Sequence, residues 1–106
     1  MPMANDILLK IADIELDSRR MEVRRAQKII SLTPLEFKLL EYLIRNKNTV
    51  VSRKELLTQL WQYSPDIQTR VVDVYIGYLR KKIDGQSTRK LISSIRGMGY
   101  TIREDL

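Results

Sequence analysis

Two helix-start signals in the middle of the chain constrain its fold most strongly. In the stretch LTPLEF, Thr33 stands at the N-cap, Pro34 at the first helical position and Glu36 at the third, which is a capping box with a well-placed proline. The stretch VSRKEL repeats the device, with Ser52 as the cap and Glu55 completing the box. Each signal predicts that a helix begins directly after its cap.

The apolar residues after each signal recur at helical spacing, which predicts helices near 33–46 and 52–61. The stretch NKNTVV between them is expected to be a short turn with one brief strand. A third helix is predicted from about residue 69 to 84, ended by Gly85. The expected buried residues are Phe37, Leu40, Leu43 and Ile44 in the first helix, Leu56, Leu57 and Leu60 in the second, and Val72, Ile76, Leu79 and Ile83 in the third.

The segments on either side of the helices have strand patterns. Residues 7–32 alternate apolar and polar positions in short runs, which predicts an antiparallel sheet of three or four strands. Residues 91–103 contain two β-rich runs joined through Gly97 and Gly99, which predicts a hairpin with Arg96 at its tip. We therefore expect one α+β domain over residues 1–106, made of an N-terminal antiparallel β-sheet (7–32), a three-helix core (33–84) and a C-terminal β-hairpin (91–103).

Composition narrows the possible functions. The chain has no histidine and no cysteine, which removes the commonest general base, the commonest neutral metal ligand and any thiolate site. The lone Gly-x-Gly in RGMGY lacks the following helix that a phosphate cradle needs. We therefore expect no enzyme, no cofactor and no metal. No apolar run is long enough to span a bilayer and no signal-peptide pattern occurs, so we expect a cytoplasmic protein without a membrane partner.

Positive charge is concentrated in the last third of the chain. The net charge is +6, from 19 basic and 13 acidic residues. Residues 69–103 hold eight basic and two acidic residues, whereas residues 1–68 hold eleven and nine. Such a patch favours a polyanion, most often nucleic acid, with an anionic membrane surface as the lesser alternative and a solvated basic surface as the plain one.

The outer face of the predicted third helix has an unusual composition. Small apolar, aromatic and basic residues together suit a DNA major groove, which admits a helix and offers thymine methyls and phosphates. A glycine in a helix costs about 1 kcal/mol relative to alanine, but here it would let the backbone approach closely. Two alternatives stay open: Gly77 packs under a neighbouring loop, or Tyr75 and Tyr78 are partly buried against the sheet or hairpin. The outer face holds Arg70, Val74, Gly77 and Lys81, with Tyr78 beside them.

Four stretches carry a more specific resemblance. They are LTPLEFKLLEYLIRN, VVSRKELLTQLW, TRVVDVYIGYLRKKI and LISSIRGMGYTI, and their order and spacing closely resemble the C-terminal DNA-binding domain of OmpR/PhoB-type response regulators from about Leu8 to Arg103. The resemblance implies a winged helix-turn-helix that controls transcription by sequence-specific binding to double-stranded DNA. The third helix would enter the major groove, and the C-terminal hairpin, or wing, would reach the adjacent minor groove.

The resemblance has further implications for partners. It implies a receiver domain upstream, absent from this chain, that is phosphorylated by a sensor kinase. It implies a domain that is monomeric alone and binds direct repeats as a head-to-tail pair. It also implies a contact between RNA polymerase and the loop formed by Gln62, Tyr63, Ser64, Pro65, Asp66, Ile67 and Gln68.

Individual DNA contacts follow from the same resemblance. Asp73 matches a structural position that bonds within the domain. On the helices, the matched positions are Trp61, Arg70 and Arg80 for phosphates, and Val71 and Val74 for bases or sugar edges. On the wing, they are Arg96 for the minor groove, Tyr100 as a donor to phosphate, and Ser94 for the DNA backbone.

Two departures from the family pattern affect the expected recognition. Many members carry a basic pair in the middle of the third helix, where this chain has Gly77 and Tyr78, and Tyr75 stands where histidine or another polar residue is frequent. Bidentate arginine–guanine readout is therefore not available at Tyr78. We infer that recognition uses apolar contact, tyrosine hydroxyls and groove shape, with more of the specificity on Arg96. A winged-helix module that binds protein or RNA remains the alternative, because fold does not imply function.

Overall fold

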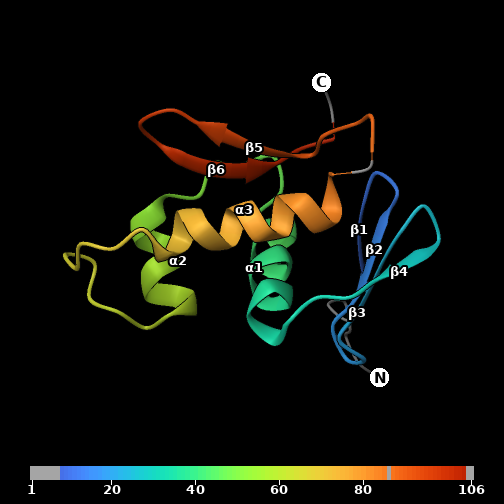
Figure 1. Ribbon diagram of the computed structural model, residues 1–106, viewed down its shortest axis with the longest axis horizontal. Coiled ribbons are helices and arrows are strands. Elements are labelled where there is room, and N and C mark those ends of the chain that lie inside the picture. Colours follow the sequence, from blue (N-terminus) through green and yellow to red (C-terminus); the bar gives the residue numbers. More distant parts are fainter. Residues whose placement is uncertain (1–7, 86, 105–106) are drawn as a thin grey trace.

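The computed structural model describes residues 8–85 and 87–104. Residue 7, the expected start of the sheet, lies outside these residues, as do both ends of the expected domain. The predicted α+β architecture is confirmed: a four-stranded sheet comes first, then three helices, then a two-stranded hairpin. The elements are β1 Leu8–Ile11, β2 Ile14–Asp17, β3 Glu22–Arg25, β4 Lys28–Ile30, α1 Pro34–Arg45, α2 Arg53–Leu60, α3 Val71–Ile83, β5 Ile92–Ile95 and β6 Gly99–Ile102 (Figure 1).

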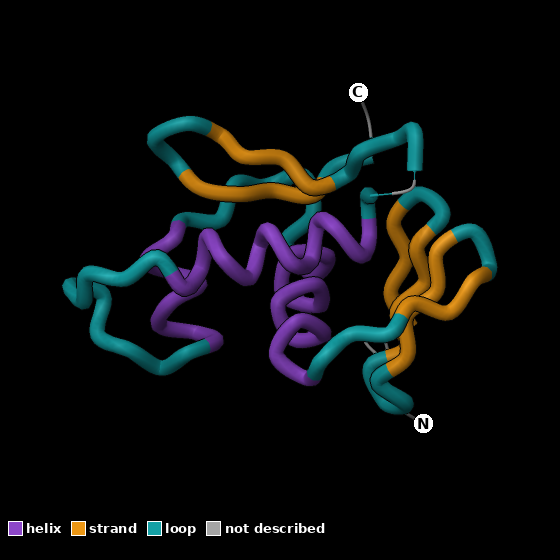
Figure 2. Tube along the Cα trace, viewed as in Figure 1, coloured by secondary structure: helices purple, strands orange, loops and turns teal. Residues whose placement is uncertain are grey.

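The arrangement leaves one side of α3 uncovered. The hairpin β5–β6 runs along α3, α1 crosses beneath it, and the four-stranded sheet lies beyond its C-terminal end (Figures 1 and 2). The sheet is an antiparallel meander in the order β1-β2-β3-β4, and it buries Ile11, Ile14, Leu16 and Val23. Of the residues that the structure describes, none belongs to a helix long and apolar enough to cross a bilayer.

The first capping box is confirmed and the second is only half formed. The Glu36 backbone N–H donates to the Thr33 hydroxyl over 3.2 Å, and the Thr33 N–H donates to the Glu36 carboxylate over 2.9 Å. Ser52 accepts from the Glu55 N–H over 3.0 Å, but the Glu55 carboxylate accepts a hydrogen bond from the Tyr42 hydroxyl on α1. The prediction that the Glu55 carboxylate bonds back to the Ser52 N–H is therefore wrong, because Tyr42 on α1 binds this carboxylate instead.

The predicted apolar stripes form the core almost as expected. Ten of the eleven residues predicted to be buried in the helices are so, and Leu60 is instead partly exposed at the end of α2. The third helix begins at Val71, two residues later than predicted, with the Thr69 hydroxyl accepting from the Val71 N–H over 3.2 Å. The stripe of α3 that faces the core fixes which side of the helix faces outward.

The predicted brief strand between α1 and α2 attaches the wing to the helices. Val51 and Tyr100 exchange two backbone hydrogen bonds, of 2.8 and 2.9 Å. Gly99 lies beside this bridge with a φ of 148°, and a Cβ there would lie 2.1 Å from the Val51 carbonyl oxygen. Only glycine fits this close approach, so Gly99 sets the base of β6.

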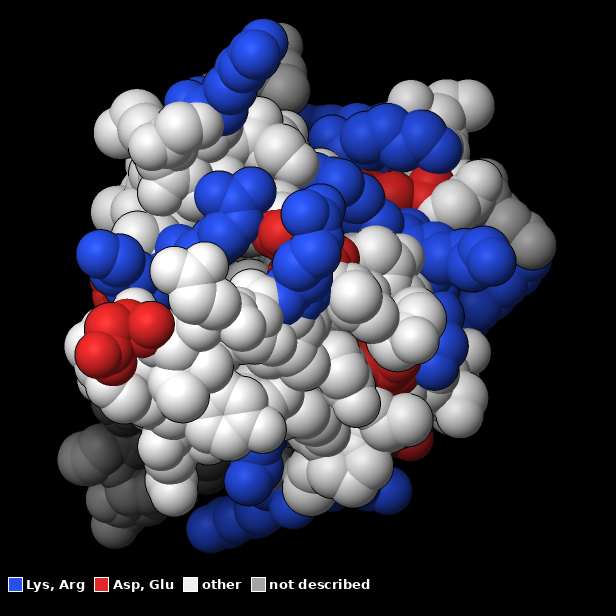
Figure 3. Space-filling view, turned by 60° about the vertical axis from the view of Figure 1, so that its left-hand side comes forward, with Lys and Arg blue, Asp and Glu red and all other residues white. Residues whose placement is uncertain are grey.

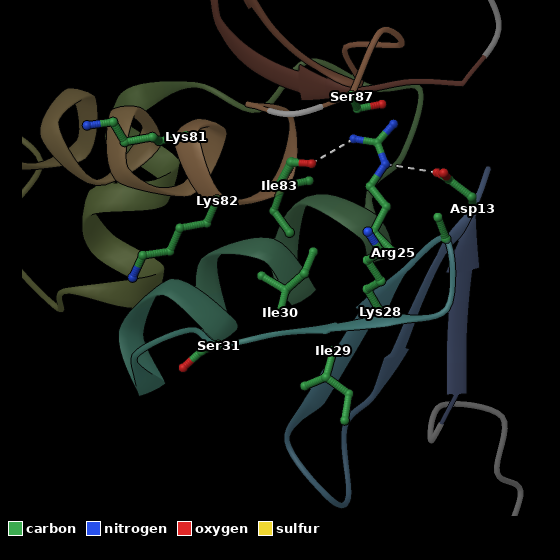
Figure 4. A pocket seen from close by; sticks show the side chains of 11 residues that line it. Asp13, Arg25, Lys28, Ile29, Ile30, Ser31, Lys81, Lys82, Ile83 and Ser87 are labelled. Atoms are coloured by element: carbon green, nitrogen blue, oxygen red, sulfur yellow. Dashed lines mark hydrogen bonds and ion pairs between the residues drawn. The ribbon is translucent and has the colours of Figure 1, made fainter.

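A buried ion pair joins the sheet, the end of α3 and the start of the wing. Arg25 is 6% exposed, and its guanidinium donates to Asp84 over 2.7 Å. It also donates to the Ile83 carbonyl over 2.8 Å and to Asp13 over 2.9 Å (Figure 4). The Asp84 carboxylate also accepts from the backbone N–H of Leu91 and of Ile92, at 3.1 and 3.0 Å. One carboxylate therefore holds β5 against the C-terminus of α3, beside a hollow of about 530 Å³.

Candidate nucleic-acid interface

The outer face of α3 carries the residues that the sequence placed there. Val74 is 44% exposed and Tyr78 50% exposed, and Arg70, Gly77 and Lys81 are exposed as well. Lys82 differs, because its ammonium pairs with the Glu36 carboxylate over 2.7 Å. The face pointing away from the core is therefore an apolar stretch with an exposed cation at each end.

Gly77 is not explained by packing. A Cβ built at this position meets no atom within 4 Å. The alternative that Gly77 packs under a neighbouring loop is therefore wrong, and alanine would fit the free protein without a clash. Glycine is unfavourable in a helix, and no contact with the described residues accounts for it at this position.

Three aromatic rings connect the end of α2 to this face. Trp61 and Tyr75 lie 5.4 Å apart between ring centroids at an interplanar angle of 74°. Tyr75 and Tyr78 lie 5.3 Å apart at 67°. Edge-to-face contacts of this kind are favourable for aromatic pairs. Tyr75 is partly buried, as one alternative expected, but its ring partners are Trp61 and Tyr78 instead of the sheet or the hairpin. Tyr78 stays half exposed.

Arg80 links α3 to the wing. Its guanidinium donates to the Ser94 hydroxyl over 2.5 Å and to the Ile92 carbonyl over 3.3 Å, and it lies 5.8 Å from the centroid of the Tyr100 ring. The structure thus brings together Arg80 and Ser94, which the resemblance assigned separately to a phosphate and to the DNA backbone. A hollow of about 410 Å³ opens beside them, lined by Gly77, Arg80, Lys81, Asp84, Gly85, Lys90 and Ile92.

The wing tip and the α2–α3 loop lie at the same end of the molecule (Figure 1). Arg96 is exposed in the turn between β5 and β6, next to Met98, which is 60% exposed. Every residue of the loop from 62 to 68 is exposed. In Figure 3, Lys and Arg side chains gather over the upper part of this face, where the hairpin lies, and leave an uncharged area below them.

Comparison with known proteins identifies the domain. The family model described as "Transcriptional regulatory protein, C terminal" matches residues 26–102, which is well over half of the chain. The chain belongs to the OmpR/PhoB family of response regulators. It is 42% identical over 91 residues to the transcriptional regulatory protein YkoG of Bacillus subtilis, covering 86% of this chain and 40% of YkoG.

Other members of the OmpR/PhoB family are similar to this chain in sequence or in fold. The response regulator MprA of Mycobacterium tuberculosis is 39% identical over 101 residues, covering 95% of this chain and 44% of MprA. The chain therefore spans about two fifths of the length of these curated relatives. The Klebsiella pneumoniae RstA DNA-binding domain, solved in complex with the RstA box, superposes with a TM-score of 0.84 at 25% identity over 92% of this chain and 98% of RstA.

Asp73 has the internal role that the OmpR/PhoB resemblance implied. Its carboxylate accepts from Arg53 over 2.7 Å and from the Tyr100 hydroxyl. Burial alone would raise the pKa of Asp73, but the hydrogen bonds from Tyr100 and Arg53 outweigh it and hold the pKa below its usual value. Burial and the bond to Asp73 in turn raise the pKa of Tyr100. No local pattern indicated the role of Arg53, because its partner lies on another helix.

The resemblance assigned Tyr100 as a donor to DNA phosphate, but in the structure its hydroxyl already has a partner inside the domain. Tyr100 is 5% exposed, and its hydroxyl donates a hydrogen bond to the Asp73 carboxylate. A phosphate contact would require this internal bond to be exchanged. The remaining predicted positions, Trp61 and Val71, are partly exposed and pack against the core.

Proposed function

We propose that this chain is the DNA-binding effector domain of a response regulator that controls transcription. It binds duplex DNA sequence-specifically, with α3 in the major groove and the tip of β5–β6 in the adjacent minor groove. The observation that carries the proposal is the exposed side of α3, which projects an apolar stretch between two cations while the hairpin runs beside it with Arg96 at its tip. A helix of this width fits the major groove.

The proposed DNA contacts are of two kinds: contacts to phosphates, which position the domain on the duplex, and contacts in the grooves, which read the sequence. Arg70, Lys81 and Arg80 supply cations for phosphates along the groove edges, and the hollow between α3 and β5 gives a phosphate strand room beside Arg80 and Ser94. Arg96 enters the minor groove, where a narrow A·T-rich stretch attracts arginine. Trp61 lies at the end of α2 for one more backbone contact.

The partners of the full-length regulator are proposed by analogy with the family. We infer that residues 1–106 form a single effector domain that follows a receiver domain phosphorylated by a sensor kinase. The domain is monomeric alone and pairs head to tail on direct repeats, and the exposed loop 62–68 contacts RNA polymerase. The protein works in the cytoplasm and has no catalytic role.

A selection from random duplex DNA at about 150 mM salt tests the proposal, because salt sets how strongly non-specific binding competes. The expected result is an enriched direct repeat with half-sites spaced about one helical turn apart. Arg96→Ala should weaken binding to the enriched site more than Arg20→Ala, which removes the same charge from the turn between β2 and β3. If the protein retains DNA without enriching a motif, specific regulation is refuted. If it retains no DNA, a module that binds protein or RNA is favoured.

A further inference from the structure

Three adjoining residues form what we call the apolar strip of α3: Val74, Gly77 and Tyr78. Gly77 and Tyr78 follow Val74 by three and four residues, so both adjoin Val74 on one side of the helix. All three are exposed, and the cations Arg70 and Lys81 lie one turn before and one turn after them. The strip thus occupies the middle of the proposed interface, and the charges are at its ends.

Folding does not account for the strip. Val74 and Tyr78 lie on the side opposite the core residues Val72, Ile76 and Leu79. Gly77 has open space where a side chain would be. A helix surface exposed only to water would be more stable with alanine at that position and with polar residues on either side.

The ring of Tyr78 is held in place before any ligand arrives. Its edge-to-face contact with Tyr75, and the contact of Tyr75 with Trp61, connect it to the partly buried end of α2. An aromatic ring fixed in this way presents an apolar surface with little loss of side-chain freedom on binding. The strip is therefore a preformed surface with a bare backbone at its centre.

We propose that the apolar strip of α3 recognises the C5 methyl groups of thymines in the major groove. This inference rests on the proposed function. Among the base edges in that groove, thymine alone offers an apolar group, and the strip contains none of the Arg, Lys, Asn or Gln side chains that read bases by paired hydrogen bonds. Val74 and the Tyr78 ring contact the methyls, and Gly77 lets the backbone come close enough for both.

The spacing of the two contacts predicts the spacing of the thymines. Residues 74 and 78 are separated by about 6 Å along a helix axis, and base pairs stack about 3.4 Å apart. Two thymine methyls about two base steps apart therefore match Val74 and Tyr78. In the major groove, two thymine methyl groups thus supply the specificity that many DNA-binding proteins obtain from an arginine bound to guanine.

Replacing thymine by deoxyuridine tests this inference, because the two bases differ only in the C5 methyl. With the site from the random selection, each thymine is replaced in turn and the dissociation constant is measured by fluorescence anisotropy at about 150 mM salt. The wild-type protein should bind about fourfold more weakly when either contacted methyl is removed, and equally well when a thymine outside the centre of the half-site is changed.

Two variants assign the methyls to residues. Val74→Ala should abolish the effect of deoxyuridine at one position, and Tyr78→Ala at the other, because the contact is then already lost. Arg70→Ala is the matched control: it should weaken binding to the thymine and deoxyuridine duplexes alike, leaving their ratio unchanged. The wild-type measurement stands even if a variant is unstable.

The outcomes separate this inference from the proposed function. A selected motif whose central thymines can all be replaced by deoxyuridine without loss overturns methyl recognition and leaves specific DNA binding intact. A motif with guanine and no thymine at the centre of each half-site overturns it as well. If the selection enriches no motif at all, the proposed function is refuted, and methyl recognition, which rests on it, is refuted with it.

Discussion

Replacing Gly77 with alanine should stabilise the free protein and weaken its binding to DNA. Alanine is favoured over glycine in a helix by about 1 kcal/mol, and the added Cβ meets nothing within 4 Å, so no clash offsets that gain. For a domain of about 100 residues, 1 kcal/mol corresponds to a rise in the melting temperature of about 4–8 °C. Most substitutions in a DNA-binding surface carry no such gain in stability.

The same methyl group would lie between α3 and the floor of the major groove. Forcing an extra carbon into a packed contact costs about 1–3 kcal/mol, which predicts a loss of about fivefold to about 150-fold in affinity for the selected duplex. Gly77→Gln should keep the gain in helix stability and bind still more weakly, because its side chain is longer.

Two measurements decide the outcome: calorimetric melting of the free domain and fluorescence anisotropy with the selected site. Higher stability with unchanged affinity would refute the close approach of α3 to DNA at this residue. Lower stability would show that glycine serves the fold instead, against the open space around it.

Three further predictions concern charged residues. Arg80→Ala should weaken binding to all sequences alike and reduce the slope of log affinity against log salt by about one; a loss confined to one base pair would make it a specificity residue. Arg25→Ala should lower the free energy of unfolding in urea by about 3–5 kcal/mol, because the buried Asp84 loses its cation; a loss under about 1 kcal/mol would contradict the role of this pair. The pKa of Asp73 is lower in the folded state than in the unfolded chain, so its stabilising contribution is fully present above the unfolded pKa and is lost as the pH falls through the folded pKa. Urea unfolding from about pH 7 to about pH 2 should therefore show a smaller acid loss for Asp73→Asn than for the wild type, and equal losses would argue against the depressed pKa.

Local signals predicted the helices well because their causes are local. The Thr33 capping box joins residues three apart, and the core stripe of α3 follows from helical spacing alone. Knowing which side of α3 faces the core also determines the outer side, so the exposure of Val74 and Tyr78 followed from the same pattern.

Contacts between distant residues could not be predicted in this way. The Arg25–Asp84 pair joins residues 59 apart, and nothing near either residue indicates the other. The Glu55 carboxylate fitted a capping box by its spacing, yet it accepts from Tyr42 because α1 packs against α2. The Tyr100 hydroxyl was assigned to phosphate by resemblance, and in the fold it lies against Asp73, 27 residues away.

Backbone amide chemical-shift mapping on addition of the selected duplex tests the central claim most directly, since it reports which face of the domain binds. If α3 and the wing bind DNA as proposed, the largest changes fall along residues 70–81 of α3 and its N-terminal flank, and at the wing tip around Arg96, with little change in β1 to β4. Changes concentrated in the four-stranded sheet, with α3 and the wing unaffected, would contradict the account.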